Sequence, residues 1–597
     1  MTQSWGSSSR PGMSASLLIG LAVLCVGCGV QHAESAGSGR RMMMKVSIAD
    51  SLTKLTREPE PGERPLTAGP VRLGAARNER ESFQVVVEAD GAPLRGVLAT
   101  VSALAHESGR RTIAPQSILV NPVGYVETEG PAYRVSRVGW WPDPLLPPGP
   151  VDIEAGRRQP FWITVHVPDD APPGSYRGRI TVSAEGAAEE TVALELTVWD
   201  FALAPTPPLP SAIALYTGAI GAFHGQRPVS EQTLQSYWDM MFTHRLSSDD
   251  LGSPLDEGIG PVIAGRGIPP DDYGLFDSRL EYCFPRGLTA FQAARLPGFQ
   301  TEGPDLTALQ QERVVAYLGK FAKHLEARGW LDRAFVMVWD EPKDSYAGSV
   351  LKELQTIHRV HPKLRTRLDG PVTGPLVEAV QEEVDIWGLH MLNIAHGGAE
   401  AWENIARWRK QNRVLWMYVA CDVHHPYPNL FIDYPLIDCR ILPWICWKYD
   451  FQGFLYWSAN AWGGENVRGA DRGGKWPNRP WVAANFVNHW GGRTNKFNGD
   501  GHLLYPGPDG TALSSVRLEA LRDGMEDYEY LWLLGKAVEK LRGKSEHEAL
   551  AAQASQLLAG QPIVTSFTEW STNHEELSAT REKLAELIVR VQKAAGT

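Results

Sequence analysis

From about residue 211 onward, the chain alternates short apolar runs with longer amphipathic stretches, and this alternation constrains the fold more than any other feature. Short strands that alternate with crossover helices build a parallel sheet covered by helices. We expect eight strands, the number that closes a sheet into a (β/α)8 barrel. The predicted strands lie near residues 211–217, 245–250, 280–291, 334–339, 364–369, 384–391, 413–420 and 452–458.

The part of the chain before the barrel has a period of two. In "TVALELTVWDF", the residues Val192, Leu194, Leu196 and Val198 fall on one face of an extended strand, and "SFQVVVEA" (82–89) alternates similarly. The overall prediction is an α/β protein in which an all-β sandwich precedes the barrel and a helical extension follows it. Its boundaries are a sandwich at 41–204, a Pro-rich linker at 205–210, the barrel at 211–540 and a helical segment at 541–597, packed on the outside of the barrel.

The stretch "SVRLEALRDGMEDYEYLWLL" (515–534) is predicted to be the eighth barrel helix, because Leu518, Leu521, Met525 and Leu531 recur at helical spacing. Its outer face can then carry the charged residues. Structural ion pairs are the favoured interpretation of that face, since the spacing allows pairing across helical turns among Arg517, Arg522, Glu526 and Glu529.

The N-terminus reads as a secretory signal. Residues 14–27, "SASLLIGLAVLCVG", are apolar but short for a membrane span, so we assign residues 1–40 to a signal peptide and a flexible leader. Gly27-Cys28 resembles the end of a bacterial lipoprotein signal, in which the cysteine is lipidated, and an ordinary cleaved signal is the alternative. The expected location is the periplasm or the cell surface, with membrane attachment through Cys28 if it is lipidated.

The composition of the chain bears on which molecules it can bind. The net charge of -11 and the absence of a long basic run argue against nucleic acid as a partner. Beyond the signal, the cysteines have no zinc-site spacing, so we expect buried thiols, no structural metal and no cofactor at Cys283, Cys421, Cys439 and Cys446. The sequence predicts no oligomeric state.

The run "AFVMVWDEPKD" (334–344) carries the strongest candidate for chemistry. It ends the predicted fourth strand in Asp340 and Glu341, and the carboxyl ends of barrel strands open onto the active site. Two carboxyl groups in a sugar cleft can hydrolyse a glycosidic bond. The alternative is structural, because acids followed by Pro342 also suit the first turn of a helix.

Two hydrolytic mechanisms remain open, beside a non-catalytic carbohydrate-binding protein. Adjacent carboxylates suit substrate assistance, in which the 2-acetamido oxygen of the sugar attacks the anomeric carbon. One acid then orients the acetamido group while the other serves as acid and base. In a conventional double displacement, Glu341 is the acid/base and Asp422, after the seventh strand, is the nucleophile.

Further polar and aromatic residues end the later strands and are candidates for contacts with a glycan or glycoconjugate substrate. An aromatic face can stack on a sugar, and a phenol can hydrogen-bond the acetamido carbonyl; packing in the core is the alternative for each. The candidates are Trp457 and Trp462 for stacking, Tyr418 and Tyr456 for the acetamido group, and Asp369 and His390 for sugar hydroxyls.

Six stretches, taken together and in this order, are similar to one known group: "GAARNERESFQVVV" (74–87), "GWWPDPLLP" (139–147), "VWDEP" (338–342), "YPNLFIDYPLIDCRILPW" (427–444), "GFLYWSANAW" (453–462) and "LEALRDGMEDYEYLWLL" (518–534). The chain resembles glycoside hydrolase family 123 and the wider group that shares the domain of unknown function 4091. The resemblance covers nearly the whole mature chain. It implies a β-sandwich before a (β/α)8 barrel and release of β-linked N-acetylgalactosamine by substrate assistance, with Asp340 orienting the acetamido group and Glu341 as acid/base.

Overall fold

The structure is a computed structural model that describes residues 43–61, 63–252, 272–295, 306–462, 485–488 and 495–596. The predictions of a signal, a leader and lipidation at Cys28 lie outside these residues. Among the helices that are described, none is long and apolar enough to cross a membrane.

Two sheets enclose the N-terminal core, and we call residues 43–202 the sandwich. One sheet has the order β1 (Met43–Asp50), β3 (Arg80–Asp90), β10 (Arg158–His166), β7 (Ile118–Glu127) and β8 (Trp140–Leu145). The other has the order β2 (Val71–Arg77), β12 (Glu190–Ala202), β11 (Gly174–Ser183), β4 (Leu94–Val101) and β9 (Val151–Ile153), with β5 (Leu104–His106) and β6 (Thr112–Ile113) alongside.

The predicted alternation is confirmed in β12, where Leu194, Leu196 and Val198 are buried between exposed or half-buried neighbours. It is absent in β3, which is buried almost throughout. The reason is that both faces of β3 are covered: apolar residues face the sandwich core, while Ser82 approaches Glu519 of a helix on the other side.

Seven parallel strands form a nearly closed barrel, which we take to span residues 211–513. They follow the order β13 (Ser211–Ile213), β19 (Gly453–Tyr456), β18 (Val414–Val419), β17 (Ile386–His390), β16 (Arg365–Gly370), β15 (Ala334–Asp340) and β14 (Phe291–Arg295). The predicted strand at 280–291 is wrong except for its last residue. Helix α4 (Gly274–Cys283) occupies its start, because Phe276, Leu280 and Cys283 bury one helical face.

The predicted strand at 245–250 is a segment without the regular hydrogen-bond ladder of a β-strand. It nevertheless fills the opening between the two edge strands of the sheet. The amide of Ile213 in β13 donates to the Ser247 carbonyl at 3.1 Å, and the amide of Gln292 in β14 donates to the Asp249 carbonyl at 2.9 Å. This segment therefore closes the barrel.

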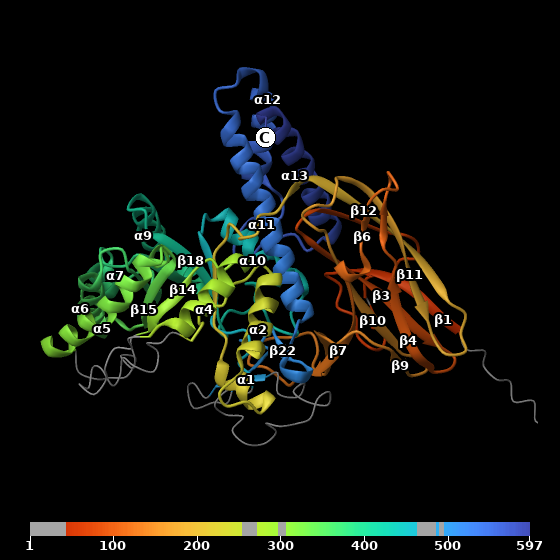
Figure 1. Cartoon of the computed structure of the whole chain (residues 1–597), viewed down its shortest axis with the longest axis horizontal. Coiled ribbons are helices and arrows are strands. Elements are labelled where there is room, and N and C mark those ends of the chain that lie inside the picture. The colour runs from red at the N-terminus through yellow and green to blue at the C-terminus, as the bar shows by residue number, and fades with distance from the viewer. Residues whose placement is uncertain are drawn as a thin grey trace, which may run out of the picture. The chain divides into compact units, whose positions relative to one another are not determined.

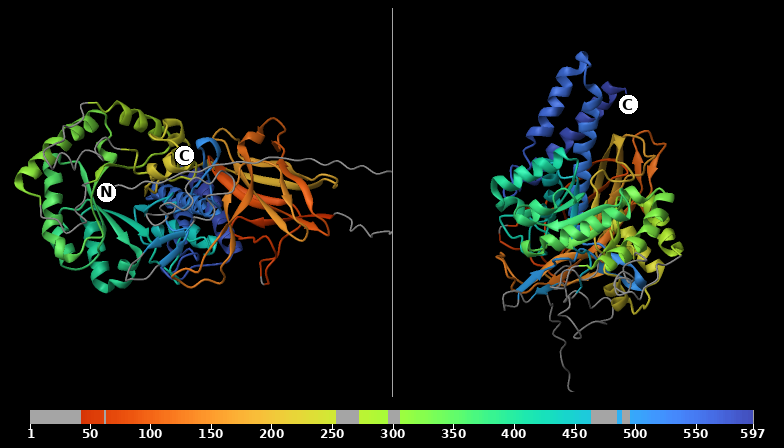
Figure 2. Two further views of the ribbon diagram at one scale, coloured as in Figure 1. Left: turned by 90° about the horizontal axis from the view of Figure 1, so that it is seen from below. Right: turned by 90° about the vertical axis from the view of Figure 1, so that its left-hand side faces the viewer.

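Helices surround the barrel strands, as the green and teal ribbons in the left view of Figure 2 show. Beside α4 they are α1 (Thr217–His224), α2 (Glu231–Thr243), α5 (Ala308–Ala327), α6 (Ala347–Val360), α7 (Pro375–Val380), α8 (Met391–His396), α9 (Gly398–Lys410) and α10 (Leu436–Lys448). Two short antiparallel pairs follow β19: β20 (Asn485–Asn488) with β21 (Asn495–Asn498), and β22 (Tyr505–Pro506) with β23 (Ala512–Leu513). Cys283, Cys421, Cys439 and Cys446 are free and buried, as predicted.

Helix α11 (Val516–Leu541) runs between the barrel and the sandwich (Figure 1). It contacts α10 on one side and strands β3 and β8 on the other. The expected exposed charged face is therefore wrong: Arg517, Arg522, Glu526 and Glu529 are all buried. The prediction of structural ion pairs is confirmed, because Arg522 pairs with Glu526 and also with Glu519.

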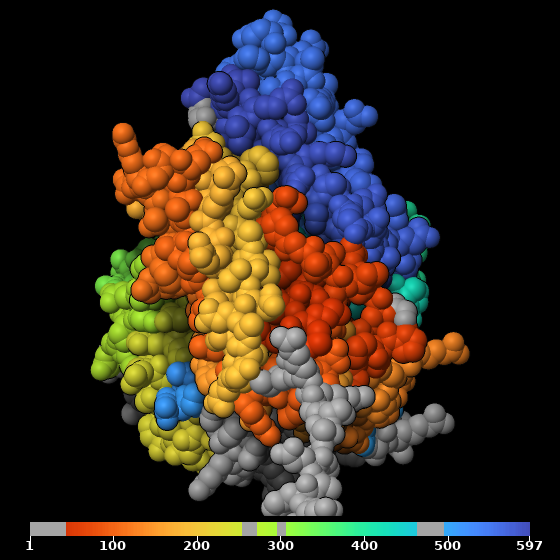
Figure 3. All heavy atoms as spheres, turned by 90° about the vertical axis from the view of Figure 1, so that its right-hand side faces the viewer, coloured from red at the N-terminus to blue at the C-terminus, as the bar shows by residue number. Residues whose placement is uncertain are grey.

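The C-terminal residues form α12 (Glu548–Gly560) and α13 (His574–Ala595). Helix α13 does not pack on the barrel alone. It contacts α11 and the sandwich strand β12, and Figure 3 shows the dark blue C-terminal helices directly against the red N-terminal strands. Arg581 joins the two parts by pairing with Glu79 and Glu81.

Candidate active site

The two adjacent carboxylates stand at the end of β15. This strand is buried from Ala334 to Trp339, because helices cover its outer face and the barrel core its inner face, and then ends in the exposed Asp340. Asp340 lies opposite Asp369, near the end of the neighbouring strand β16. The apolar run thus delivers both acids to the carboxyl edge of the sheet.

Glu341 has a left-handed backbone, with φ of 49°, which costs about 1–2 kcal/mol for a residue with a Cβ. Its amide donates to the Asp369 carbonyl at 3.0 Å, which fixes this conformation. Gly370 makes room for it, since a Cβ at position 370 would lie 2.9 Å from the Glu341 Cα. The surroundings therefore hold Glu341 in one orientation.

The interpretation of the pair as helix caps is wrong. The helical segment begins with the 3-10 turn η4 (Asp344–Tyr346), which has Lys343 as its N-cap, and continues into α6 at Ala347. Asp344, which is nearer, accepts the amide of Leu376 at 3.1 Å, in the first turn of α7. Neither Asp340 nor Glu341 is needed to begin a helix.

A pocket of about 550 Å³ opens at this edge of the barrel. It is lined by both acids and by four of the predicted substrate-binding residues: Asp369, Tyr418, Tyr456 and Trp457. Each comes from the end of a barrel strand or the residue just beyond it, which explains how segments more than a hundred residues apart meet in one site.

Tyr418 holds one of the two acids. Its hydroxyl donates to Glu341 Oε1 at 2.6 Å, a length typical of a hydrogen bond to a charged acceptor. Burial, together with the Glu341 carboxylate, raises the pKa of Tyr418 well above its usual value, so the phenol keeps the proton that it donates. The sequence predicts that Tyr418 binds the acetamido group of the sugar. In this structure its hydroxyl binds Glu341 instead.

Asp369 and Asp249 share one arginine inside the barrel. Arg367 donates to both oxygens of Asp369, at 2.9 and 2.6 Å, and to Asp249 at 3.2 Å. Burial raises the pKa of Asp249, against the opposing charge of Arg367. Asp369 lines the pocket as predicted, but its carboxylate is already held in a bidentate pair.

Sequence reasoning missed Asp500, which lies in the Gly- and Trp-rich stretch after the predicted eighth strand. Its carboxylate accepts the Tyr456 hydroxyl at 2.9 Å and the Trp457 indole N–H at 3.1 Å. Burial raises the pKa of Asp500 to about 6. Its position between Gly499 and Gly501 in "NGDG" is the local signal of a tight turn that presents one side chain.

Tyr216, just beyond β13, was also missed. Tyr216 is 43% exposed and lines the pocket, and its ring lies 6.3 Å from the Trp457 ring between centroids. The half-buried Trp457 and the exposed Tyr216 form the aromatic part of the lining.

Two predicted substrate contacts are not among the described residues that line the pocket. Trp462 is buried, donates its indole N–H to the Leu504 carbonyl at 2.7 Å and packs edge-on against Phe223, so it is a core residue. His390 is buried behind Tyr418, with ring centroids 4.9 Å apart, and its Nε2 lies 3.1 Å from the Asp422 carboxylate. Asp422 itself is also outside the lining.

Models of known protein families match both parts of the chain. The model described as "Glycoside hydrolase 123, catalytic domain" matches residues 308–534, and "Glycoside hydrolase 123 N-terminal domain" matches residues 50–184. The chain belongs to glycoside hydrolase family 123. It is therefore a glycoside hydrolase, and the matched catalytic region contains Asp340, Glu341 and Tyr418.

One solved structure agrees with the fold of this family 123 hydrolase, and a second is similar only in part. A family 123 glycoside hydrolase from Clostridium perfringens, described for glycolipid glycan hydrolysis, has 15% sequence identity and a TM-score of 0.66, over 93% of this chain and 99% of that chain. A family 39 glycoside hydrolase from Bacteroides cellulosilyticus has 12% identity and a TM-score of 0.30, over 66% and 76% of the chains. No curated protein sequence matches the chain.

The charge of the pocket suits glycoside hydrolysis by a family 123 enzyme. Its described lining holds one arginine, Arg367, and six acids: Asp249, Asp250, Asp340, Glu341, Asp369 and Asp500. The transition state of glycosidic cleavage resembles an oxocarbenium ion, so positive charge develops on the sugar. An acidic lining stabilises that charge more than it stabilises the neutral substrate.

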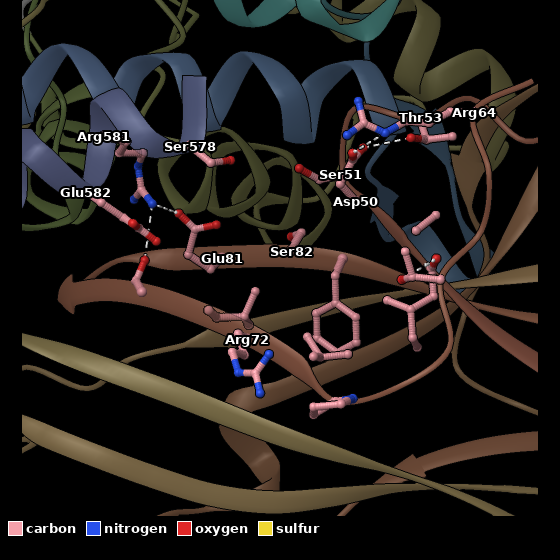
Figure 4. Close-up of a pocket in the computed structure, with 18 of the residues that line it drawn as sticks. Asp50, Ser51, Thr53, Arg64, Arg72, Glu81, Ser82, Ser578, Arg581 and Glu582 are labelled. Carbon is pink, nitrogen blue, oxygen red and sulfur yellow. Dashed lines mark hydrogen bonds and ion pairs between the residues drawn. The ribbon is translucent and has the colours of Figure 1, made fainter. Parts of the chain in front are cut away.

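A second hollow, of about 340 Å³, lies where strands β1 to β3 meet α13 (Figure 4). Its polar side chains mostly bind one another: Arg581 pairs with Glu81 and donates to the Gly74 carbonyl at 3.1 Å, and Thr53 donates to Asp50 at 2.8 Å. Asp340 and Glu341 are not among its lining residues. We therefore interpret this hollow as part of the interface between the sandwich and helix α13, and not as a second active site.

Proposed function

We propose that this hydrolase releases a β-linked N-acetylhexosamine, with N-acetylgalactosamine as the preferred sugar, by a retaining, substrate-assisted mechanism. The observation that carries the proposal is the pair itself: Asp340 and Glu341 are adjacent, exposed and in one pocket, and Tyr418 holds Glu341 by a 2.6 Å hydrogen bond.

The roles follow from the adjacency of the two acids. A double displacement needs a second carboxylate across the sugar ring, about 5 Å from the acid/base, whereas substrate assistance needs no enzyme nucleophile and can use two neighbouring acids. Asp340 then accepts the acetamido N–H, which strengthens the acetamido oxygen as nucleophile, and Glu341 protonates the leaving oxygen. Glu341 next takes a proton from the water that opens the cyclic intermediate, so the enzyme ends unchanged.

The double displacement with Asp422 as nucleophile has less support. The Asp422 side chain is 54% exposed, contacts His390 and is outside the described lining of the pocket. A nucleophile must stand within reach of the anomeric carbon that Glu341 serves. Substitution of Asp422 nevertheless discriminates between the two mechanisms.

Turnover of aryl glycosides tests the proposal. Aryl β-N-acetylgalactosaminide is compared with the acetylglucosaminide and the plain galactoside, and a glycolipid glycan is included because the C. perfringens relative is described for hydrolysing one. We expect release from N-acetylated sugars only, and a loss of about 100-fold or more in Asp340→Asn and Glu341→Gln. Release of the plain galactoside, or heavy loss in Asp422→Asn with Asp340→Asn active, would contradict it.

We also propose that the enzyme is exported and acts in the periplasm or at the cell surface, with lipid attachment at Cys28. The support is the apolar stretch at 14–27 followed by Gly27-Cys28. Mass spectrometry of the mature N-terminus, in the wild type and in Cys28→Ser, tests this. A lipid mass on Cys28 is the expected result, and a mature chain that begins elsewhere contradicts the anchor.

A further inference from the structure

The turn at residues 499–502 fixes the aromatic wall of the pocket. Asp500, at its tip, binds the Trp457 indole N–H and the Tyr456 hydroxyl, and the Gly501 amide donates to that same hydroxyl at 2.7 Å. The fit is tight, since a Cβ on Gly501 would lie 2.1 Å from Trp457 Cζ2. A displacement of this turn would therefore displace Trp457.

Arg517, in the first turn of α11, holds this turn from behind. It is fully buried. It donates to the Gly499 carbonyl at 3.0 Å and also to the carbonyls of His502 and Leu430. The bonds to Gly499 and His502 hold the turn on both sides of Asp500. Because guanidinium donors are fixed in one plane, the position of Arg517 determines the position of the turn.

The sandwich positions Arg517. Asp143, in strand β8, accepts the Arg517 Nε and Nη2 donors at 2.8 Å each, and accepts the Tyr505 hydroxyl at 2.5 Å. The Leu145 amide in the same strand donates to the Ser514 carbonyl at 2.9 Å, just before α11. The Asp143 carboxylate and the three carbonyls together accept all five N–H donors of the Arg517 guanidinium. The side chain of Arg517 is therefore held in one orientation.

We propose that the sandwich is a positioning part of the active site: Asp143, through Arg517 and the turn that carries Asp500, holds Trp457 where the sugar stacks. The inference rests on the pocket at Asp340 and Glu341 being the active site. It assigns to the sandwich a role in substrate binding, although the described lining of the pocket includes no sandwich residue. Asp143 and Arg517 are positioning residues, because they act through Trp457.

A matched control exists in the same molecule. Glu79 is also a buried sandwich carboxylate, pairs with Arg581 of a helix and accepts the Tyr530 hydroxyl at 2.7 Å, as Asp143 pairs with Arg517 and accepts Tyr505. Glu79 does not line the pocket. Asp143→Asn and Glu79→Gln therefore each replace a buried, arginine-paired carboxyl group by an amide, and only Asp143 is connected to Trp457 through the contacts described above.

The kinetic test measures KM and kcat separately on the aryl N-acetylglycoside that the wild type cleaves best. We expect Asp143→Asn to raise KM at least tenfold with kcat within threefold, whereas Glu79→Gln leaves KM unchanged. A purely structural loss lowers the active fraction and hence kcat, and leaves KM alone. In a Trp457→Phe background, Asp143→Asn should raise KM less than twofold further. An unchanged KM in Asp143→Asn, or an equal rise in Glu79→Gln, overturns the proposal.

Hydrogen exchange supplies a readout that needs no substrate. Amides in the peptide that contains residues 499–502 should exchange at least tenfold faster in Asp143→Asn and at the wild-type rate in Glu79→Gln; equal rates in all three proteins overturn the proposal. A wild type that cleaves no N-acetylated glycoside contradicts the proposed function, while this exchange result still decides the positioning role. If Asp143→Asn does not fold, Arg517→Lys with Arg581→Lys as control takes its place under the same criteria.

Discussion

Glu341 shows how single residues shape this site. Its left-handed backbone is retained because the Asp369 carbonyl accepts its amide and because Gly370 has no side chain. Strained backbone of this kind costs about 1–3 kcal/mol and persists where the surroundings determine it. At the acid that we propose as acid/base, these contacts fix the direction of the carboxylate.

Gly370→Ala tests that dependence. Its Cβ would press on the Glu341 Cα and Cγ, each at 2.9 Å, so we expect a loss of about 2 kcal/mol in stability together with a fall in kcat/KM. Gly374→Ala is the control. Position 374 also has a positive φ, 97°, but its Cβ would meet only the Asp344 carboxylate, at 3.3 Å. Equal activity in the two variants would show that Gly370 does not support Glu341.

Tyr418→Phe removes the donor to Glu341. A hydrogen bond to a charged group contributes about 1.5–3 kcal/mol, so a fall in kcat of about 10- to 100-fold is expected in steady-state assays. Tyr237→Phe is a matched control, because Tyr237 is also buried and its hydroxyl lies 2.8 Å from His224 Nε2, outside the pocket. Wild-type kcat in Tyr418→Phe would remove Tyr418 from the mechanism.

At the scale of one element, α11 is unusual because the charged residues of its first half, from Arg517 to Glu529, are inside the protein. Arg522 lies between Glu519, Asp523 and Glu526, and all four are buried. Burial alone would raise the pKa of Glu519, but the charges of Arg522 and His244 outweigh it and lower that pKa well below the usual value. The ionised form is thus stabilised by folding.

The pH dependence of stability follows from that sign. A carboxyl group whose pKa is lowered by folding contributes stability above its unfolded pKa of 4.5 and loses it as the pH falls further. Glu519→Gln should therefore cost about 3 kcal/mol at pH 7 and progressively less below pH 4.5, measured by urea unfolding. Glu88→Gln, which removes an exposed pair with Lys45, should cost under about 1 kcal/mol. A constant difference between wild type and Glu519→Gln across this range would contradict the assignment.

For the whole molecule, the sandwich covers the charged face of α11. A fragment that begins at residue 205 would leave Arg517 without the Asp143 carboxylate and would remove the Ser82 hydroxyl that accepts from Arg522. Loss of its carboxylate partner costs several kcal/mol for a charge that remains buried, as Arg517 would. We expect this fragment to be aggregated or unfolded by size-exclusion chromatography and circular dichroism. A folded fragment with full activity would show that the barrel is independent.

What the sequence predicts well is what depends on local pattern. Strands β15, β17, β18 and β19 are apolar runs with a carboxylate, tyrosine or histidine near the end, so both their positions and their candidate site residues could be predicted. The segment at 247–249 has only two backbone-to-backbone hydrogen bonds to the described strands on its sides, which no local pattern reveals. Asp500 was missed because its place depends on Arg517 and Asp143, and these contacts join residues up to 374 positions apart.

The most direct test of substrate assistance changes the nucleophile itself. We would measure kcat/KM for aryl β-N-acetylgalactosaminides in which the acetyl group carries none, one, two or three fluorine atoms. If the acetamido oxygen attacks the anomeric carbon, electron withdrawal by fluorine weakens it, and kcat/KM should fall by about a thousandfold across the series. A flat series, with activity lost in Asp422→Asn, would contradict the account and assign the attack to an enzyme carboxylate.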